Sequence, residues 1–149
     1  RTAHALHASV LASAPAHARL PRVVGFVSVP GTGLRLGRAT APTSAAEGGS
    51  VVVNGMCAGT GGFAAEVRGT GASALASVGD VSDWAYGTEL VSTAVDAYGQ
   101  LDALVNNAGL VRDRMLVNMS EEEWDVVLRV DLKGHFVPLR HAAGYWKDR

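Results

Sequence analysis

The sequence predicts an α/β fold, a Rossmann-like doubly wound parallel sheet that is truncated on its C-terminal side. From residue 22 onward, short β-branched runs alternate with glycine-rich turns and helical patterns, which is typical of βαβ units. A glycine turn follows the first of these runs, and an Asn-Asn-Ala-Gly tetrad follows the last. The chain has 149 residues, whereas a complete fold of this type usually needs ~250. We therefore expect an N-terminal fragment of a larger domain.

Four short strands are expected, at residues 23–29, 50–54, 72–78 and 101–105. Between the third and the fourth, Ser82 is expected to cap a helix whose apolar stripe runs from Leu90 to Tyr98. Gly99 stands where a C-terminal cap belongs.

A second helix is expected after the fourth strand. Ser120 and Glu123 predict a capping box, in which the hydroxyl and the carboxylate satisfy free backbone amides reciprocally. Because acidic residues at a helix start complement the helix dipole, we interpret them as structural rather than catalytic. The face expected to be buried is formed by Trp124, Val127, Leu128, Leu132 and Phe136.

The composition argues against several classes of function. Thirteen Lys and Arg against fourteen Asp and Glu give a net charge of −1, which predicts no nucleic-acid partner. No apolar run approaches the ~20 residues that span a bilayer, so no membrane partner is expected. The single Cys57 favours a reducing compartment, and we expect a cytoplasmic protein. His4 and His7 could share a helical face, but no third ligand is near them, so no metal site is expected.

The first 21 residues differ in composition from the remainder. They are rich in alanine, and no acidic residue occurs before Glu47. We expect residues 1–21 to be a disordered or leader segment; a transit peptide and sequence from outside the true domain are the alternatives. Residues 22–149 are expected to form an incomplete dinucleotide-binding domain.

Two motifs carry the functional prediction. Glycines at positions 31, 33 and 37 follow a strand and precede a helix, where a pyrophosphate requires a tight turn and close backbone approach. This spacing alone is a weak signal in a chain with 18 glycines. The tetrad Asn106–Gly109 is more specific, since the chain has few other asparagines and the tetrad ends a strand, where open parallel sheets bind ligands.

These motifs resemble the short-chain dehydrogenase/reductase family. The resemblance covers residues from about 23 to 149. It rests on the glycine turn, VVVN at 51–54, Asp80-Val81, LDALVNNAG at 101–109, RDRMLVNMSEEEWD at 112–125 and VDLKG at 130–134. Within the family, the sequence is most similar to dehydrogenases and reductases of 3-hydroxyacyl thioesters.

The resemblance implies an oxidoreductase that uses NAD or NADP and a small hydroxy or keto substrate. It assigns to the cofactor the positions Gly31, Gly33, Leu36, Gly37, Asp80, Val81, Asn107, Ala108 and Gly109. The first four would hold the pyrophosphate, the next two would flank the adenine, and the last three would adjoin the ribose and the sheet. The family's catalytic Ser and Tyr-x-x-x-Lys are absent from these 149 residues, so we expect this chain to be inactive.

Four positions depart from the family pattern. Arg35 occupies the place of the family's middle glycine, and Pro42 falls inside the following helix. Gly55 replaces the acidic residue that would bind the adenosine ribose, which leaves the choice between NAD and NADP open. Asp131 stands where the family usually has an Asn that helps to hold a proton-relay water, and it is the one candidate catalytic residue. A damaged or mistranslated front end would explain why the first three departures lie so close together.

A second hypothesis remains beside the oxidoreductase. The chain could be a non-catalytic nucleotide-binding or interaction module derived from the same family. Because the helix from Ser120 commonly packs between subunits in that family, the resemblance is compatible with a homo-oligomer formed through this helix.

Overall fold

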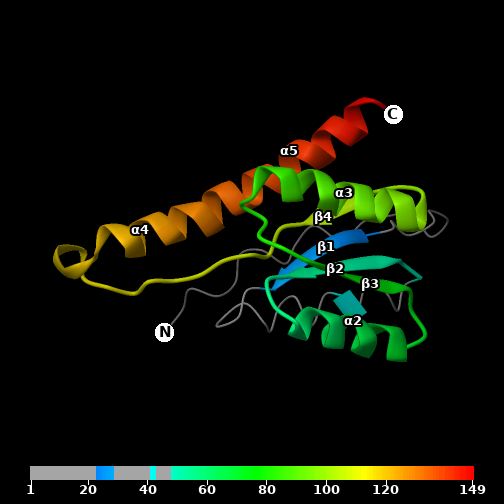
Figure 1. The fold of residues 1–149 in the computed structure, drawn as a ribbon, viewed down its shortest axis with the longest axis horizontal. Helices are drawn as coiled ribbons and strands as arrows, with labels where there is room; N and C mark the ends of the chain where they lie inside the picture. Colours follow the sequence, from blue (N-terminus) through cyan, green and yellow to red (C-terminus); the bar gives the residue numbers. More distant parts are fainter. Residues whose placement is uncertain (1–22, 29–40, 43–47) are drawn as a thin grey trace, which may run out of the picture.

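The computed structural model of the chain describes residues 23–28, 41–42 and 48–149. Its centre is a parallel sheet of four strands with the order β3-β2-β1-β4 (Figure 1). The strands are β1 (Val23–Ser28), β2 (Val51–Gly55), β3 (Ala74–Val78) and β4 (Ala103–Val105). The chain steps outward from β1 to β3 and then crosses to the other side of β1, so the doubly wound α/β prediction is confirmed.

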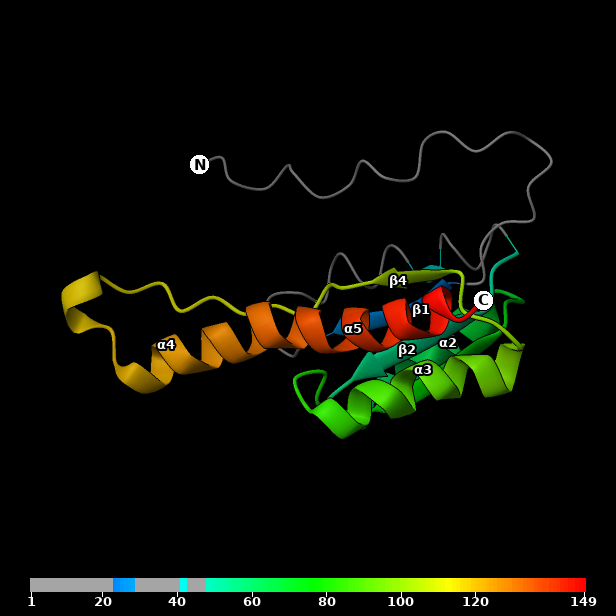
Figure 2. The same ribbon diagram turned by 90° about the horizontal axis from the view of Figure 1, so that it is seen from above.

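Helices cover both faces of this sheet. Helix α2 (Gly59–Gly69) lies on one face, and α3 (Trp84–Tyr98) and α5 (Gly134–Lys147) lie side by side on the other (Figures 1 and 2). Residues 110–127 project beyond the sheet as an arm, which includes η1 (Leu116–Asn118) and α4 (Glu121–Val127). The π-helical turn η2 (Leu128–Lys133) joins α4 to α5.

Strand β2 is the buried centre of the molecule. All five of its residues are buried, because helices cover both faces of the sheet there. Val51 and Val53 pack with Phe63 of α2 on one face, whereas Val52 packs with Leu90 of α3 on the other. A strand buried on both sides needs a continuous apolar run, which explains its three consecutive valines.

Helix α3 corrects one predicted cap and confirms another. The expected N-cap at Ser82 is wrong: the N-cap is Asp83, whose carboxylate accepts a hydrogen bond from the Tyr86 N–H at 2.8 Å. Ser82 instead donates both its N–H and its hydroxyl to Asp80. Gly99 is confirmed as the C-cap, with a φ of 77° that favours glycine.

The capping box at the start of α4 is also confirmed. The Ser120 hydroxyl accepts from the Glu123 N–H, and the Glu123 carboxylate accepts from the Ser120 N–H, both at 3.2 Å. A hydrogen bond from Arg114 lowers the pKa of the Glu123 carboxyl, with the Ser120 N–H acting in the same direction. The arm therefore ends in a locally defined helix start, although it projects beyond the sheet.

The sequence predicted a buried face on this helical segment, and that prediction is wrong for four of its five residues. We name them the exposed stripe: Trp124, Leu128, Leu132 and Phe136, which are 53%, 40%, 66% and 54% exposed. The fifth, Val127, is half-buried. The buried apolar positions are Val130 and Val137 instead, because η2 and α5 turn that side toward the loop after β3 and toward α3.

Several sequence predictions concern residues that the structure does not describe. Residues 1–21 and the glycine turn, with its Arg35, lie outside the described residues. Ala41 and Pro42 are helical, as expected for the helix after that turn, and Ala41 is fully buried.

Candidate functional site

The carboxyl ends of all four strands lie at one edge of the sheet, because the strands are parallel. The connections diverge at β1, since β2 lies on one side of it and β4 on the other. A divergence of this kind opens a ligand crevice in doubly wound sheets. Among the described loops at this edge, two carry residues predicted from the sequence: the β3 loop, residues 79–83, and the β4 loop, residues 106–110. They form the candidate site.

Asp80 is the polar centre of the β3 loop. Its Oδ1 accepts hydrogen bonds from the Ser82 N–H at 2.9 Å and from the Ser82 hydroxyl at 2.7 Å. Its Oδ2 forms an ion pair with Nη1 of Arg129 at 3.2 Å. Val81, the next residue, is buried in the core beneath α3. The loop therefore combines a carboxylate held by three donors with a buried apolar side chain.

The Tyr86 side chain packs against the start of the β3 loop and bonds to residues at the ends of β2 and β3. Its hydroxyl accepts from Asn54 Nδ2 and lies within hydrogen-bond distance of the Ser77 Oγ, both at 2.5 Å. Asn54 Nδ2 also donates to the backbone oxygen of Ser77 at 3.1 Å. Burial raises the pKa of the Tyr86 phenol, outweighing the opposing effect of these hydrogen bonds, so the group stays neutral at physiological pH.

Gly79 begins the β3 loop directly against the Tyr86 ring. A Cβ at this position would lie 2.5 Å from Cζ of Tyr86 and closer still to two other ring carbons. Real Cβ atoms essentially never approach a neighbour this closely. Only glycine therefore lets the chain leave β3 along this path.

The β4 loop is tied to α5 by two reciprocal hydrogen bonds. Asn106 Nδ2 donates to the backbone oxygen of His135 at 3.1 Å, and His135 Nε2 donates to the backbone oxygen of Ala108 at 2.6 Å. Ala108 is buried, whereas Asn107 and Gly109 are half-buried beside it. The tetrad is thus a fixed loop at the carboxyl edge, as its position after a strand predicted.

Asp131 approaches the β4 loop from the π-helical turn η2. Its Oδ1 accepts a hydrogen bond from the Leu110 N–H at 2.9 Å. A Cβ added at Gly109 would lie 3.6 Å from the same oxygen, which is an ordinary contact. π-helical turns are rare and often occur at functional sites. The carboxylate therefore lies beside the last residues of the tetrad.

Six residues predicted from sequence lie at this edge: Asp80, Val81, Asn107, Ala108, Gly109 and Asp131. The remaining four, Gly31, Gly33, Leu36 and Gly37, lie outside the described residues. Sequence reasoning missed the residues that hold the loops in place, namely Tyr86, Arg129 and His135. Arg129 and Asp80 are 49 positions apart in the chain, and no local pattern connects residues at that separation.

Comparison with known proteins identifies the family. A family model described as short chain dehydrogenase matches residues 26–149. The chain belongs to the short-chain dehydrogenase family. Members of this family are oxidoreductases that generally bind NAD(P). The family therefore accounts for both the doubly wound sheet and the motif-bearing loops at its carboxyl edge.

Relatives and solved structures agree with this family. The chain is 46% identical over 127 residues to a hydroxyacyl-CoA dehydrogenase of Mycobacterium tuberculosis and 40% identical over 133 residues to the peroxisomal multifunctional enzyme type 2 of Mus musculus. These alignments cover 81% and 83% of this chain but 40% and 18% of the relatives. A short chain dehydrogenase from Mycobacterium avium superimposes with a TM-score of 0.77 at 42% identity, covering 88% of this chain and 48% of that structure. The chain thus spans less than half the length of these proteins.

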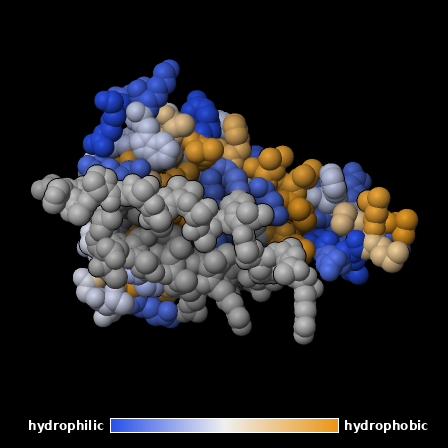
Figure 3. All heavy atoms as spheres, turned by 180° about the vertical axis from the view of Figure 1, so that it is seen from behind, coloured by the Kyte–Doolittle hydropathy of each residue, from blue (hydrophilic) through white to orange (hydrophobic). Residues whose placement is uncertain are grey.

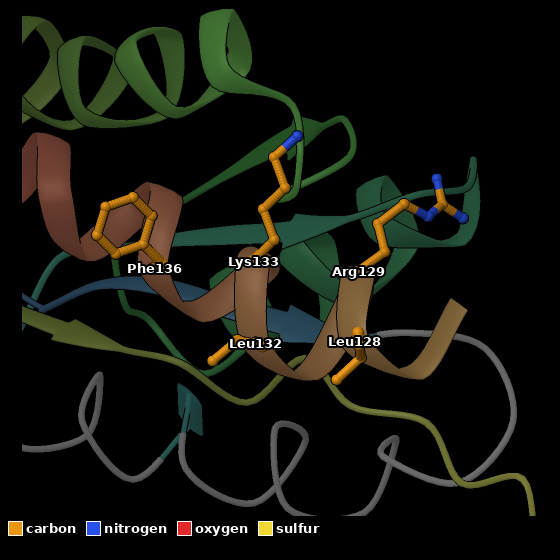
Figure 4. A pocket seen from close by; sticks show the side chains of 5 residues that line it. All are labelled: Leu128, Arg129, Leu132, Lys133 and Phe136. Carbon is orange, nitrogen blue, oxygen red and sulfur yellow. The ribbon is translucent and has the colours of Figure 1, made fainter. Parts of the chain in front are cut away.

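Other kinds of site have less support in the described residues. None of the helices in the described ranges is long and apolar enough to cross a membrane. In the same part of the chain, no group of three or more His, Cys, Asp and Glu side chains is placed to hold a metal ion. The exposed stripe itself contributes Leu128, Leu132 and Phe136 to a shallow groove of about 520 Å³, which Arg129 and Lys133 also line (Figure 4).

Two buried acceptors test whether the carboxyl edge fits a dinucleotide. The Oδ1 atoms of Asn54 and Asn106 are buried and have no hydrogen-bond partner in the described part of the chain. Asn54 is on β2 near its carboxyl end, and Asn106 directly follows β4. An adenosine carries hydroxyl and amino donors, so the half-buried Asp80 carboxylate fits the adenosine half of a dinucleotide, whereas the two asparagine oxygens are buried and do not face a ligand in this arrangement.

Proposed function

We propose that the chain forms the nucleotide-binding part of an NAD(P)-dependent oxidoreductase that interconverts a hydroxyl and a keto group. The observation that carries this proposal is that the β3 and β4 loops lie at the same carboxyl edge of the sheet and are both held by side chains of the helical segment after the arm. In this proposal, residues 22–149 form the incomplete dinucleotide-binding domain. When bound, the nicotinamide cofactor supplies or accepts the hydride.

The residues of this site have separate roles in the proposal. Asp80 and Val81 flank the adenine: the carboxylate can accept from its 6-amino group, and the valine, whose side chain is buried beneath α3, anchors the loop beside the base. Asn107, Ala108 and Gly109 adjoin the ribose, where a small residue and a glycine leave room for the cofactor. Gly31, Gly33, Leu36 and Gly37 hold the pyrophosphate, on the strength of the glycine-turn motif alone.

The name of one relative supports a proposal for the substrate class. We propose a 3-hydroxyacyl thioester, because one relative is named as a hydroxyacyl-CoA dehydrogenase and the identity to it extends over most of this chain. Asp131 is proposed to act near the proton path, since its carboxylate lies where the family has an Asn and is fixed to the Leu110 N–H. An Asp adds negative charge there while keeping an acceptor oxygen.

Cofactor affinity tests the proposed function. Arg35 and Gly55 depart from the family at both ends of the adenosine site, so we expect dinucleotide binding no tighter than about high micromolar. Replacing Arg35→Gly together with Gly55→Asp should tighten NAD binding by about tenfold, the effect of one charge-assisted hydrogen bond of ~1.5 kcal/mol to the ribose. Calorimetry of wild type and double variant, with melting curves to show that both are folded, measures the difference. Equal affinities would contradict the glycine-turn assignment.

The exposed stripe supports a second proposal, self-association through α4, η2 and α5. Apolar side chains gather along this segment and the arm (Figure 3). Glu121 and Glu122 precede the stripe and Arg140 follows it. In an antiparallel pair of copies related by a two-fold axis, the acidic start of one segment therefore faces the basic end of the other. This surface also favours the non-catalytic interaction module as the alternative function.

Substitution within the stripe tests self-association. Leu132→Glu should weaken it by at least about tenfold, because a buried unpaired charge at the centre of an apolar contact costs several kcal/mol. Leu116→Glu is the matched control, since Leu116 is 83% exposed on the arm but lies outside the stripe. Sedimentation velocity at rising concentration measures the effect. A wild-type chain that stays monomeric, or equal behaviour of the two variants, would refute the interface.

A further inference from the structure

The π-helical turn η2 contacts both loops of the candidate site. Arg129 reaches Asp80 in the β3 loop at 3.2 Å, and Asp131 accepts from the Leu110 N–H in the β4 loop at 2.9 Å. Between them, Val130 is buried in the same cluster as Val81. Figure 4 shows that Arg129 projects from η2 on a different side from Leu128. One turn of helix therefore bridges two loops that lie in separate parts of the chain.

Gly134 brings the end of this turn close to the β3 loop. A Cβ at this position would lie 3.1 Å from Cγ2 of Val81 and 4.0 Å from the Ser82 nitrogen. The close packing fixes the backbone of η2 relative to the β3 loop. The backbone that carries Arg129 is therefore fixed relative to Asp80, although the Arg129 side chain is 53% exposed.

The donors around Asp80 leave one position of its carboxylate open. An ionised carboxylate has about four acceptor positions, two on each oxygen. Ser82 occupies two on Oδ1, and Arg129 occupies one on Oδ2. The remaining position is on Oδ2, and among the described residues Arg129 is the side chain that holds this oxygen.

The geometry points to Arg129 as a positioning residue for adenine recognition. It acts through Asp80, by holding Oδ2 so that its remaining acceptor position receives the 6-amino group. This inference rests on the proposed nucleotide site and adds to it a residue that no motif indicated. Arg129 contacts the carboxylate, not the nucleotide.

The size of the expected effect follows from the exposure of the pair. Exposed ion pairs contribute little to folding, so losing Arg129 should hardly change the stability of the chain. A hydrogen bond from a ligand to a charged group contributes more to the binding affinity, and part of that contribution depends on the alignment of donor and acceptor. We therefore expect adenine affinity to fall by about three- to tenfold while the melting temperature stays nearly unchanged.

Titration with AMP and with IMP tests this role. The two nucleotides differ in the base, where adenine presents a 6-amino donor and hypoxanthine a 6-oxo acceptor. Wild type should bind AMP more tightly than IMP. Arg129→Met should weaken AMP binding about three- to tenfold and leave IMP binding nearly unchanged, and Arg129→Lys should restore part of the preference for AMP. Calorimetry or ligand-detected nuclear magnetic resonance up to millimolar nucleotide gives both affinities.

Arg114→Met is the matched control. Arg114 forms a similarly exposed ion pair with Glu123 at 2.9 Å, and the structure shows no hydrogen bond or ion pair from Arg114 to Asp80. This variant should lose as little stability as Arg129→Met and keep the AMP preference. Equal AMP affinity in wild type and Arg129→Met would refute the positioning role while leaving the nucleotide site intact. No binding of AMP, NAD or NADP by the wild type would refute the proposed function itself, and the positioning role with it.

Discussion

Replacing Gly79→Ala should destabilise the fold by about 2–4 kcal/mol, and we expect it to be the most damaging single methyl addition near the site. The new Cβ would overlap the Tyr86 ring, with Cζ at 2.5 Å and two ring carbons closer. The Tyr86 ring cannot move aside without losing the hydrogen bonds of its hydroxyl with Asn54 and Ser77. Either the ring leaves this cluster or the end of β3 moves. For a chain of this size, the melting temperature should fall by roughly 5–15 °C.

Gly62→Ala is the matched control for this substitution. Gly62 lies inside α2, and a Cβ there would have no neighbour within 4 Å. Alanine should therefore raise stability by about 0.5–1 kcal/mol through its better helix propensity. Thermal and urea melts of the two variants measure the contrast. Similar melting temperatures for Gly79→Ala and wild type would show that the β3 loop does not rest on Tyr86.

The second large effect concerns catalysis. These 149 residues should show no steady turnover of NADH or NADPH with 3-oxoacyl thioesters. The proton-transfer pair of the family, Tyr-x-x-x-Lys, does not occur: the residues four places after the three tyrosines are Leu90, Asp102 and Arg149. Tyr145 and Lys147 are only two places apart, so they lie on different sides of α5. Proton transfer by a positioned side chain typically contributes ~10²–10⁴-fold.

A spectrophotometric assay of nucleotide oxidation tests this prediction. The Mycobacterium tuberculosis hydroxyacyl-CoA dehydrogenase, assayed in parallel, serves as the positive control. Oxidation by the 149-residue chain that scales with its concentration and survives repurification would contradict the expected inactivity. Such activity would mean that another acid or base, for which Asp131 is the first candidate, replaces the missing pair.

Local patterns predicted those elements that local contacts determine. The capping box at Ser120, the left-handed cap at Gly99 and the tetrad after β4 each depend on a few neighbouring residues, and all three formed as expected. Ser82 was assigned the wrong role because two adjacent residues, Ser82 and Asp83, are both good N-caps. The choice between them was made by Asp80, which engages the Ser82 hydroxyl.

Features that depend on tertiary packing were not predictable in this way. Helix α2 begins with Gly-Thr-Gly-Gly and has no side-chain cap, so its sequence gives little helical signal. It packs against the sheet through Phe63, Ala64 and Val67. The exposed stripe was predicted to be buried because helical spacing reveals an apolar face but not what covers it. The π-helical turn η2 and the ion pair between Arg129 and Asp80 likewise have no local sequence pattern from which they could be predicted.

Mapping nucleotide binding onto the chain tests the central claim most directly. Amide shifts in a ¹⁵N-labelled sample, recorded during titration with NAD, NADP and AMP, report which residues contact the ligand. The proposed site predicts saturable shifts at Asp80, Val81 and Asn107–Gly109, with residues on the far end of α3, near Tyr98, unchanged. Shifts that never saturate, or that cluster away from the carboxyl ends of β3 and β4, would contradict a nucleotide site at this edge of the sheet.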